Sequence, residues 1–320
     1  MFTLIISTVI TMSANNWISM WMGLELNMMS FIPIILKNPN KSSSEAAMIY
    51  FLIQSISSIV LLMMITMSMM KTMIPEKVIN MITTMMILLK LGSAPFHKWM
   101  PEMMSKMEWK KCIMMMTWQK LAPLMMMSNL NNNMLMIKLS IIWSVGVGSI
   151  GGINQSSLRK MMAYSSINHL GWMLTLNKSI NLWIIYWIIY SMIITMVCMM
   201  FNKYNYLFLN QINSLNMNNA EKTSLFISML SMGGLPPFIG FLPKWITIQS
   251  MMNSKEFIMI LYMIMFSLVT LMFYIRTMTN IYLSFNSTMK WMTINQSKSL
   301  SMMILMINFS LPLIMILDIL

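Results

Sequence analysis

Charged side chains are scarce in this sequence of 320 residues, at 9% of the chain. A soluble domain carries about 25% charged residues. Hydrophobic residues make up 58% of the chain, and its mean hydropathy is +0.68. The chain lacks the polar residues that would cover a core in water, so its composition predicts an integral membrane protein.

Polar and apolar residues do not alternate along the apolar runs, as they would in the strands of a membrane β-barrel. Runs of about 20 apolar residues recur instead, which is the length that a helix needs to cross a bilayer. We therefore predict an all-α fold, a polytopic transmembrane helical bundle. No separate soluble domain and no cleavable targeting segment is recognisable, so residues 1–320 are expected to form a single integral membrane domain.

Signatures of cofactor sites are missing as well. Cys112 and Cys198 are far apart and lack metal-ligand spacing, which argues against a disulfide framework or an Fe–S site. No GxGxxG or GxxxxGK motif marks a nucleotide site. We expect no metal and no other cofactor on this chain. The net charge of +13 comes from lysines scattered over short loops, so nucleic acid is not an expected partner.

Methionine, in contrast, is abundant, with 51 residues. It is spread over all apolar runs and is not gathered into loop clusters such as MxxM, which would suit a soft metal. We interpret it as an apolar filler in place of Ile and Leu. A mitochondrial genome, in which methionine has an extra codon, would produce this bias.

The hydropathy pattern predicts about eleven spans. They cover residues 2–14, 16–37, 45–70, 78–103, 109–128, 134–151, 157–176, 180–202, 223–251, 257–284 and 300–319. If the spans alternate, the loops on the side of the N-terminus carry eleven basic residues and the opposite loops carry four. The positive-inside rule then predicts the N-terminus in the cytoplasm or the mitochondrial matrix, and the C-terminus on the other side.

Two of these spans are over-long and interrupted by proline. Residues 95–101 read PFHKWMP, and residues 237–243 read PFIGFLP. Proline, phenylalanine, an aromatic residue and proline recur at the same offsets, as paired interrupted helices do in transporter-like folds built from internal repeats. Chance or a shared need to break the helix is the alternative. Proline frees backbone groups that need polar partners or water, so buried charges are expected near both breaks.

Four charged residues lie inside predicted spans, where an unpaired charge is expensive: Glu25, Lys90, Lys120 and Lys244. We interpret them as a proton relay, because a change of charge at one buried group alters the next. A protonated structural glutamate, and lysines that extend to the membrane interface, are the alternatives. The interface is least accessible to Lys120, which lies well inside its span.

Two histidines also lie inside spans, His97 in the first break and His169 further along. Histidine titrates near neutral pH and can pass protons, although a hydrogen-bonded core histidine is an equal alternative. The remaining acids stand beside loops or the C-terminus and are expected to be solvated. They include Glu45, Glu102, Glu108, Glu221, Glu256 and Asp318.

Six segments of the sequence, in order and with matching spacing, resemble the subunit-two family of mitochondrial NADH:ubiquinone oxidoreductase, respiratory complex I. They are WMGLELNMMSFIPI, SSSEAAMIYFLIQ, KLGSAPFHKWMPE, TWQKLAP, LRKMMAYSSINHLGWM and GGLPPFIGFLPKW. The resemblance extends over about residues 16–250, and the methionine content is similar to that of arthropod members.

The resemblance implies an antiporter-like, proton-pumping subunit with two inverted five-helix repeats, each containing a broken helix. The functional glutamate of the family corresponds to Glu25, its lysine on the first broken helix to Lys90, its central lysine to Lys120 and its distal residue to Lys244. The histidines of similar segments correspond to His97 and His169. Lys98 departs from the pattern, because relatives carry an apolar residue there.

The resemblance further implies that NADH, FMN, Fe–S clusters and ubiquinone are bound by other subunits. The implied partners are other membrane-arm subunits, including antiporter-like ones, and membrane lipids such as cardiolipin. The implied location is the mitochondrial inner membrane, with the N-terminus in the matrix and the C-terminus in the intermembrane space. A stand-alone cation/proton antiporter and a purely structural membrane-arm subunit remain alternative functions.

Overall fold

The computed structural model describes residues 1–70, 75–130, 134–212, 219–283 and 298–312, and every regular element in these ranges is a helix. The elements are α1 (Phe2–Ser13), α2 (Trp17–Ile35), α3 (Lys41–Met69), α4 (Glu76–Leu91), α5 (Trp99–Lys106), α6 (Trp109–Met116), η1 (Trp118–Lys120), α7 (Leu121–Ser128), α8 (Met134–Ile153), α9 (Leu158–Thr175), α10 (Ile180–Tyr204), α11 (Leu209–Ile212), α12 (Asn219–Gly233), α13 (Phe241–Asn253), α14 (Phe257–Leu283) and α15 (Lys298–Asn308). The all-α prediction is confirmed.

Among the described residues, five helices are long and apolar enough to cross a membrane. They are α2, α3, α8, α10 and α14. Several other predicted spans are divided between two shorter helices, and the last one, 300–319, runs past the described residues. The membrane-spanning character is confirmed, whereas the number of eleven spans stays a prediction.

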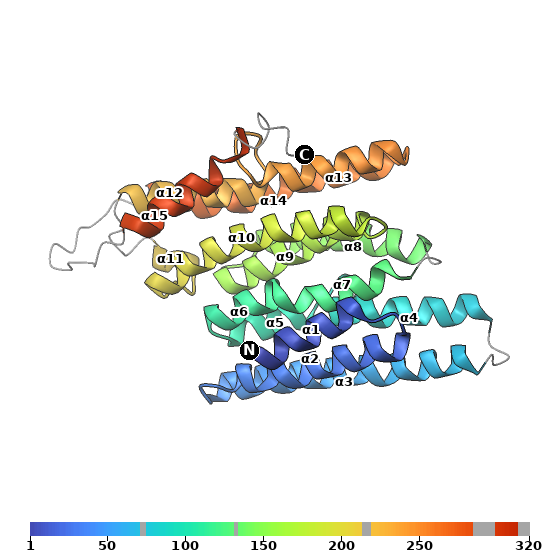
Figure 1. Cartoon of the computed structure of the whole chain (residues 1–320). Coiled ribbons are helices and arrows are strands. Elements are labelled where there is room, and N and C mark those ends of the chain that lie inside the picture. The colour runs from blue at the N-terminus through green and yellow to red at the C-terminus, as the bar shows by residue number, and fades with distance from the viewer. Residues whose placement is uncertain (71–74, 131–133, 213–218, 284–297, 313–320) are drawn as a thin grey trace.

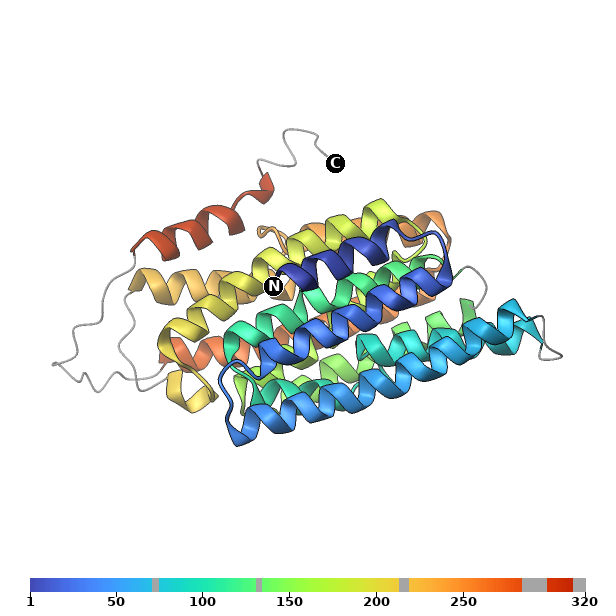
Figure 2. The ribbon, with the colours of Figure 1, turned by 60° about the horizontal axis from the view of Figure 1, so that its bottom comes forward.

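The helices lie side by side in a bundle, and the chain runs back and forth between its two ends (Figure 1). Figure 2 shows α3 at one edge of the bundle and α15, which packs against α12, at the other. The centre is occupied by α9, in which 14 of 18 residues are buried. A helix that is buried on all sides must pack against neighbours all round, so α9 can contact polar groups from several elements.

The first break separates α4 from α5. Gly92 ends α4 in the left-handed conformation, with φ of 70°, which residues with a side chain rarely adopt. A Cβ at Gly92 would also lie only 3.1 Å from the ring of Trp99. Pro95 follows without a backbone N–H, and the helix resumes at Trp99. The predicted interruption of the span 78–103 is therefore present.

The second break, between α12 and α13, is built in the same way. Gly234 follows α12 with φ of 75°, and Pro237 stands three residues later, the spacing of the first break. The next helix begins at Phe241, the position that Trp99 holds in the first break. The shared glycine conformation and the shared restart of the helix support an internal repeat.

A third interruption lies within the predicted span 109–128, and the sequence pattern does not predict it. The helix α6 ends at Met116, and the 3-10 helix η1 joins it to α7. Pro123 has no N–H to donate to the carbonyl group of Gln119 one turn earlier. This tighter turn ends at Lys120, so the central lysine of the predicted relay also stands at a helix interruption.

Replacing Gly240 by alanine is expected to destabilise the second break. A Cβ at this position would overlap the backbone oxygen of Ser231, which cannot move aside as a side-chain tip can. Such overpacking costs about 2 kcal/mol or more, so less protein should accumulate in the membrane, as measured by immunoblotting. Gly233→Ala is the control, because its nearest neighbour is a Leu271 methyl carbon at 3.4 Å. Equal amounts of both variants would contradict the packing at Gly240.

Candidate functional site

Lys120 lies at the centre of the candidate site and is only 2% exposed. Its Nζ donates hydrogen bonds to the backbone oxygen of Ser166 and to the hydroxyl group of Tyr190, each at 3.0 Å. The same atom lies 4.9 Å from the centre of the Tyr190 ring. In the part of the chain that the structure describes, no carboxylate lies within ion-pair distance of Lys120. Its partners are dipoles inside the bundle, and it does not extend to the surface.

His169 connects the surroundings of Lys120 to those of Lys244. Its ring centre lies 4.9 Å from that of Tyr190, and its Nδ1 lies 2.8 Å from the hydroxyl group of Tyr186. The two tyrosines stand one turn apart on α10 and therefore share a face. The charges of Lys244 and Lys120 both act on His169.

Lys244 lies in the first turn of α13, just beyond the second break, and is 5% exposed. Its Nζ donates to the backbone oxygen of Gly233 at 2.7 Å and lies 5.7 Å from the centre of the Trp172 ring. A Cβ at Gly234 would lie 2.7 Å from the lysine side chain. The break leaves the Gly233 carbonyl group at the end of α12 without a helical partner. The ammonium group of Lys244 donates to this carbonyl group.

Lys90 and Glu25 lie at the other end of the series. Lys90 stands in the last turn of α4 and is 4% exposed. Glu25 lies in the middle of α2, and its Oε2 is shielded from solvent without a hydrogen-bond partner in the described ranges. The charge of Glu25 acts on Lys90, although no ion pair within 4.0 Å joins them among those residues. The two predicted partners are neighbours that do not touch.

A polar network fills the space between this pair and Lys120. Gln119 accepts a hydrogen bond from the Tyr50 hydroxyl at 3.1 Å and donates one to Asn27 at 3.2 Å. Gln54 donates to the backbone oxygen of Lys90 at 3.3 Å. These residues line a cavity of about 10 Å³, which is about the room that one water molecule requires. Gln119 directly precedes Lys120 in the chain, so the network ends at the residue before the central lysine.

His97 lies apart from this series. It is half-buried, its Nδ1 is 3.2 Å from the backbone oxygen of Pro95, and its ring centre is 6.5 Å from that of Tyr164. It lines a groove between α8 and α14 together with Trp143 and Phe266. Lys98 beside it is exposed. The four predicted relay residues and His169 are thus buried or half-buried inside the bundle, whereas His97 faces its outside.

The prediction that Glu221 is solvated is wrong. Its side chain is 3% exposed, and its carboxylate lies 2.5 Å from the Nζ of Lys203. The hydroxyl group of Tyr204 also donates to this carboxylate. The end of α10 packs against the start of α12 and covers the carboxylate. Asp318 lies outside the described residues. The other acids are exposed or half-exposed at helix ends and loops as predicted, namely Glu45, Glu102, Glu108 and Glu256.

Sequence reasoning missed the neutral members of the site. Tyr186 and Tyr190 recur with one-turn spacing in the apolar stretch WIIYWIIY, a pattern that could have indicated a polar face. Gln119 and Asn27 each stand within two residues of a predicted relay residue. Nothing in the sequence indicates that Tyr50, from a different helix, donates to Gln119.

The arrangement suits the movement of protons. Amine, phenol and imidazole groups in contact can pass a proton over hydrogen-bond distances while they stay in place. Their charges influence one another strongly because burial reduces screening. Within the described ranges, no cluster of three His, Cys, Asp or Glu residues could hold a metal ion.

Comparison with known sequences agrees with the family resemblance of the six segments. The family described as "NADH:quinone oxidoreductase/Mrp antiporter, TM" matches residues 14–270. A protein named NADH-ubiquinone oxidoreductase chain 2 from Anopheles gambiae is 41% identical and covers 96% of this chain and 92% of its own length. The protein of that name from Locusta migratoria is 39% identical over 91% of this chain and 86% of its own length.

Two solved structures share the fold. A chain of respiratory complex I from Thermus thermophilus superposes with a TM-score of 0.82 at 18% identity, over 98% of this chain and 77% of that one. A chain of the Mrp complex from Dietzia sp. gives 0.78 at 14% identity, over 93% of this chain and 61% of that one. The family resemblance in the six segments is confirmed, and the chain belongs to the family of NADH-ubiquinone oxidoreductase chain 2, among the NADH:quinone oxidoreductase and Mrp antiporter membrane subunits.

Proposed function

We propose that this chain is a proton-translocating membrane-arm subunit of respiratory complex I and thereby part of an oxidoreductase complex. The observation that carries the proposal is the series of buried contacts from Lys120 through Tyr190 to His169, together with Lys244, which is bound at the end of α12 and whose charge acts on His169. The names of its relatives and the family description support a place in NADH:quinone oxidoreductase.

Lys120 is the central proton carrier in this proposal. It donates to the hydroxyl group of Tyr190, which can accept a proton on its oxygen while it gives one up. The His169 ring beside Tyr190 takes up the next proton and holds it on one of its two nitrogens. The charge of Lys244 acts on His169, so Lys244, which donates to the backbone oxygen of Gly233, is the next acceptor in the series.

Glu25 and Lys90 act as the gate of the relay. Because the charge of Glu25 acts on Lys90, a proton gained or lost at Glu25 changes the proton affinity of Lys90. The hydrogen-bonded Gln119 and its water-sized cavity then connect Lys90 to the element that carries Lys120. Redox chemistry elsewhere in the complex supplies the change of charge that starts the sequence.

The remaining assignments belong to the same proposal. NADH, FMN, Fe–S clusters and ubiquinone are bound by other subunits, and quinone reduction takes place there. The partners are other membrane-arm subunits, including neighbouring antiporter-like ones, as supported by the fold shared with chains of such complexes. The location is the mitochondrial inner membrane, with the N-terminus in the matrix and the C-terminus in the intermembrane space.

The first test is a native gel of detergent-solubilised mitochondrial membranes, probed for this chain and stained for NADH oxidation. We expect the chain in a very large band that oxidises NADH, as an integral subunit of such a complex requires. An abundant membrane protein that does not belong to the complex serves as a control for incomplete solubilisation.

Migration as a small free species would contradict the assignment to complex I. The chain would then be purified and reconstituted alone into liposomes. Proton flux driven by a cation gradient would identify the stand-alone antiporter.

A further inference from the structure

A buried tyrosine on α14 has no part in the relay described so far. Tyr274 is 1% exposed, and its hydroxyl group is shielded from solvent without a hydrogen-bond partner in the described ranges. Burying a polar group unpaired costs about 1–3 kcal/mol, so the presence of this hydroxyl calls for a reason. Tyr262 on the same helix, in contrast, donates to the backbone oxygen of Ile142 at 3.0 Å.

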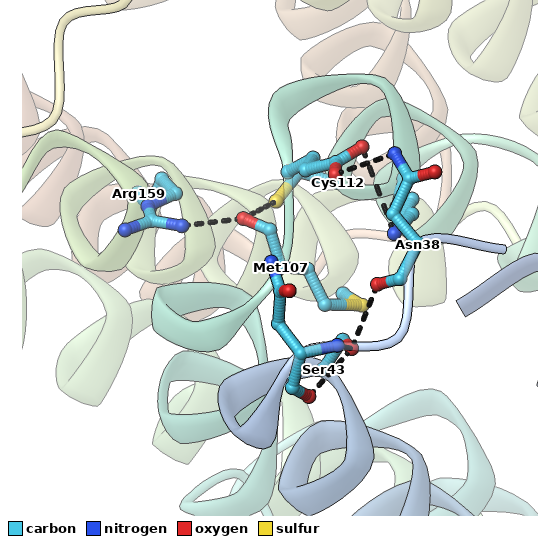
Figure 3. A network of polar contacts seen from close by, with 8 residues as sticks. Asn38, Ser43, Met107, Cys112 and Arg159 are labelled. Atoms are coloured by element: carbon cyan, nitrogen blue, oxygen red, sulfur yellow. Dashed lines mark hydrogen bonds and ion pairs between the residues drawn. The ribbon is translucent and has the colours of Figure 1, made fainter. Parts of the chain in front are cut away.

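Polar groups that hold the fold together are paired in this bundle, as the loop between α5 and α6 illustrates. In Figure 3, Arg159 and Cys112 converge on the backbone oxygen of Met107, and both hydrogen bonds tie the loop to its neighbours. The hydroxyl group of Tyr274 belongs to no such network among the residues that the structure describes. A role in holding helices together therefore does not explain it.

The ring of Tyr274 packs against the second break. A Cβ at Gly233, the last residue of α12, would lie 3.7 Å from the Cδ2 atom of the ring, which is ordinary contact. The backbone oxygen of the same glycine accepts the hydrogen bond from the Nζ of Lys244 at 2.7 Å. The phenol ring and the ammonium group are thus neighbours on either side of one glycine.

Tyr274 is also a neighbour of the relay residues on α9 and α10. A charge on Tyr274 acts on Tyr186 and on Tyr190, and Ser165 acts on Tyr274. Ser165 stands one turn before His169 on α9, so the two residues share a face of that helix. Tyr274 therefore lies in the interval between His169 and Lys244, which no hydrogen bond spans directly in the described ranges.

We propose that Tyr274 carries protons from His169 and its tyrosine partners to Lys244. The phenol oxygen accepts a proton from the imidazolium while the phenol gives its own proton to the neutral amine of Lys244. The imidazole is left neutral, Lys244 becomes an ammonium ion, and Tyr274 stays neutral throughout. Rotation of the hydroxyl hydrogen, which no partner holds, then prepares the next transfer. This inference rests on the proposed function and adds a residue to it.

The test is Tyr274→Phe in the assembled complex, reconstituted into proteoliposomes. Only the hydroxyl group is removed, so the ring keeps its contact with Gly233 and the chain should reach the NADH-oxidising band of a native gel in normal amount. We expect proton pumping to be about a hundredfold slower, at the low end of what a positioned proton carrier contributes. Replacing water by D2O should slow this variant more than the wild type, because proton transfer has become the slow step.

Two variants measured in parallel separate the possible results. Tyr262→Phe removes the same group from the same helix on the outside of the bundle, and it is expected to pump normally. Lys120→Met tests the relay itself. Normal pumping by Tyr274→Phe beside impaired pumping by Lys120→Met would overturn this inference alone, whereas normal pumping by both would contradict the proposed function.

Three other results would show that the hydroxyl group has a structural role and would equally overturn the inference. They are loss of the NADH-oxidising band in Tyr274→Phe, equal loss of pumping in Tyr262→Phe, and slowed pumping of Tyr274→Phe with the solvent isotope effect of the wild type.

Discussion

Lys120→Met is expected to slow proton pumping by about a hundredfold or more, within the range that a positioned proton carrier contributes. Methionine has nearly the same length and suits a buried site, so the packing around η1 is kept. What disappears is the ammonium group that donates to Ser166 and Tyr190. No other amine in the described ranges contacts Tyr190, so the proton path is interrupted there.

The measurement is acidification of proteoliposomes by the purified complex, followed with a pH-sensitive dye during NADH oxidation. NADH oxidation with a water-soluble artificial acceptor checks that the complex is assembled, and it is expected to be normal. Lys41→Met, an exposed lysine away from the relay, is the matched control and should pump normally. Normal pumping by Lys120→Met would remove the central carrier from the proposal.

Glu25→Gln is expected to reduce pumping to a similar degree, although it adds no bulk. The glutamine keeps the shape of the side chain but cannot change its charge, so Lys90 loses the neighbour whose charge acts on it. The complex should assemble, because Glu25 makes no hydrogen bond through Oε2 and no ion pair in the described residues that would be lost. The ratio of protons pumped to NADH oxidised measures the effect.

The double variant Glu25→Gln/Lys90→Met separates a gate from a purely structural pair. In a structural pair, each single variant leaves an uncompensated charge, and neutralising both partners restores the protein. In a gate, the double variant stays as inactive as the single ones because no switchable charge is left. Recovery of pumping in the double variant would favour the structural subunit over the proposed relay.

The charged members of the candidate site could be predicted from the sequence because a charge in an apolar run is conspicuous. Lys120 stands among methionines, and its burial and its contacts inside the bundle agree with the prediction that it does not reach the interface. The two broken helices could be predicted for a similar reason, since Pro95 and Pro237 interrupt long apolar runs. In both cases one local feature conflicts with its surroundings.

The connections between these residues could not be predicted, because they depend on how helices pack. Tyr190 contacts both Lys120 and His169, yet it stands 70 residues from the lysine in the chain. Tyrosine and glutamine are tolerated inside a membrane bundle for many reasons, so Gln119 gave no distinct signal. Glu221 was misjudged because its position near a loop says nothing of the helix end that covers it.

The order of the helices in the bundle has an electrical consequence. The elements that carry Lys90, Lys120, His169 and Lys244 succeed one another across the bundle (Figure 1), so the proposed transfers run sideways through the membrane. A membrane voltage falls along the perpendicular direction and is worth about 2.3 kcal/mol per elementary charge at about 100 mV for a full crossing. Sideways transfers therefore do almost no work against the voltage, and the load falls on the steps by which protons enter and leave.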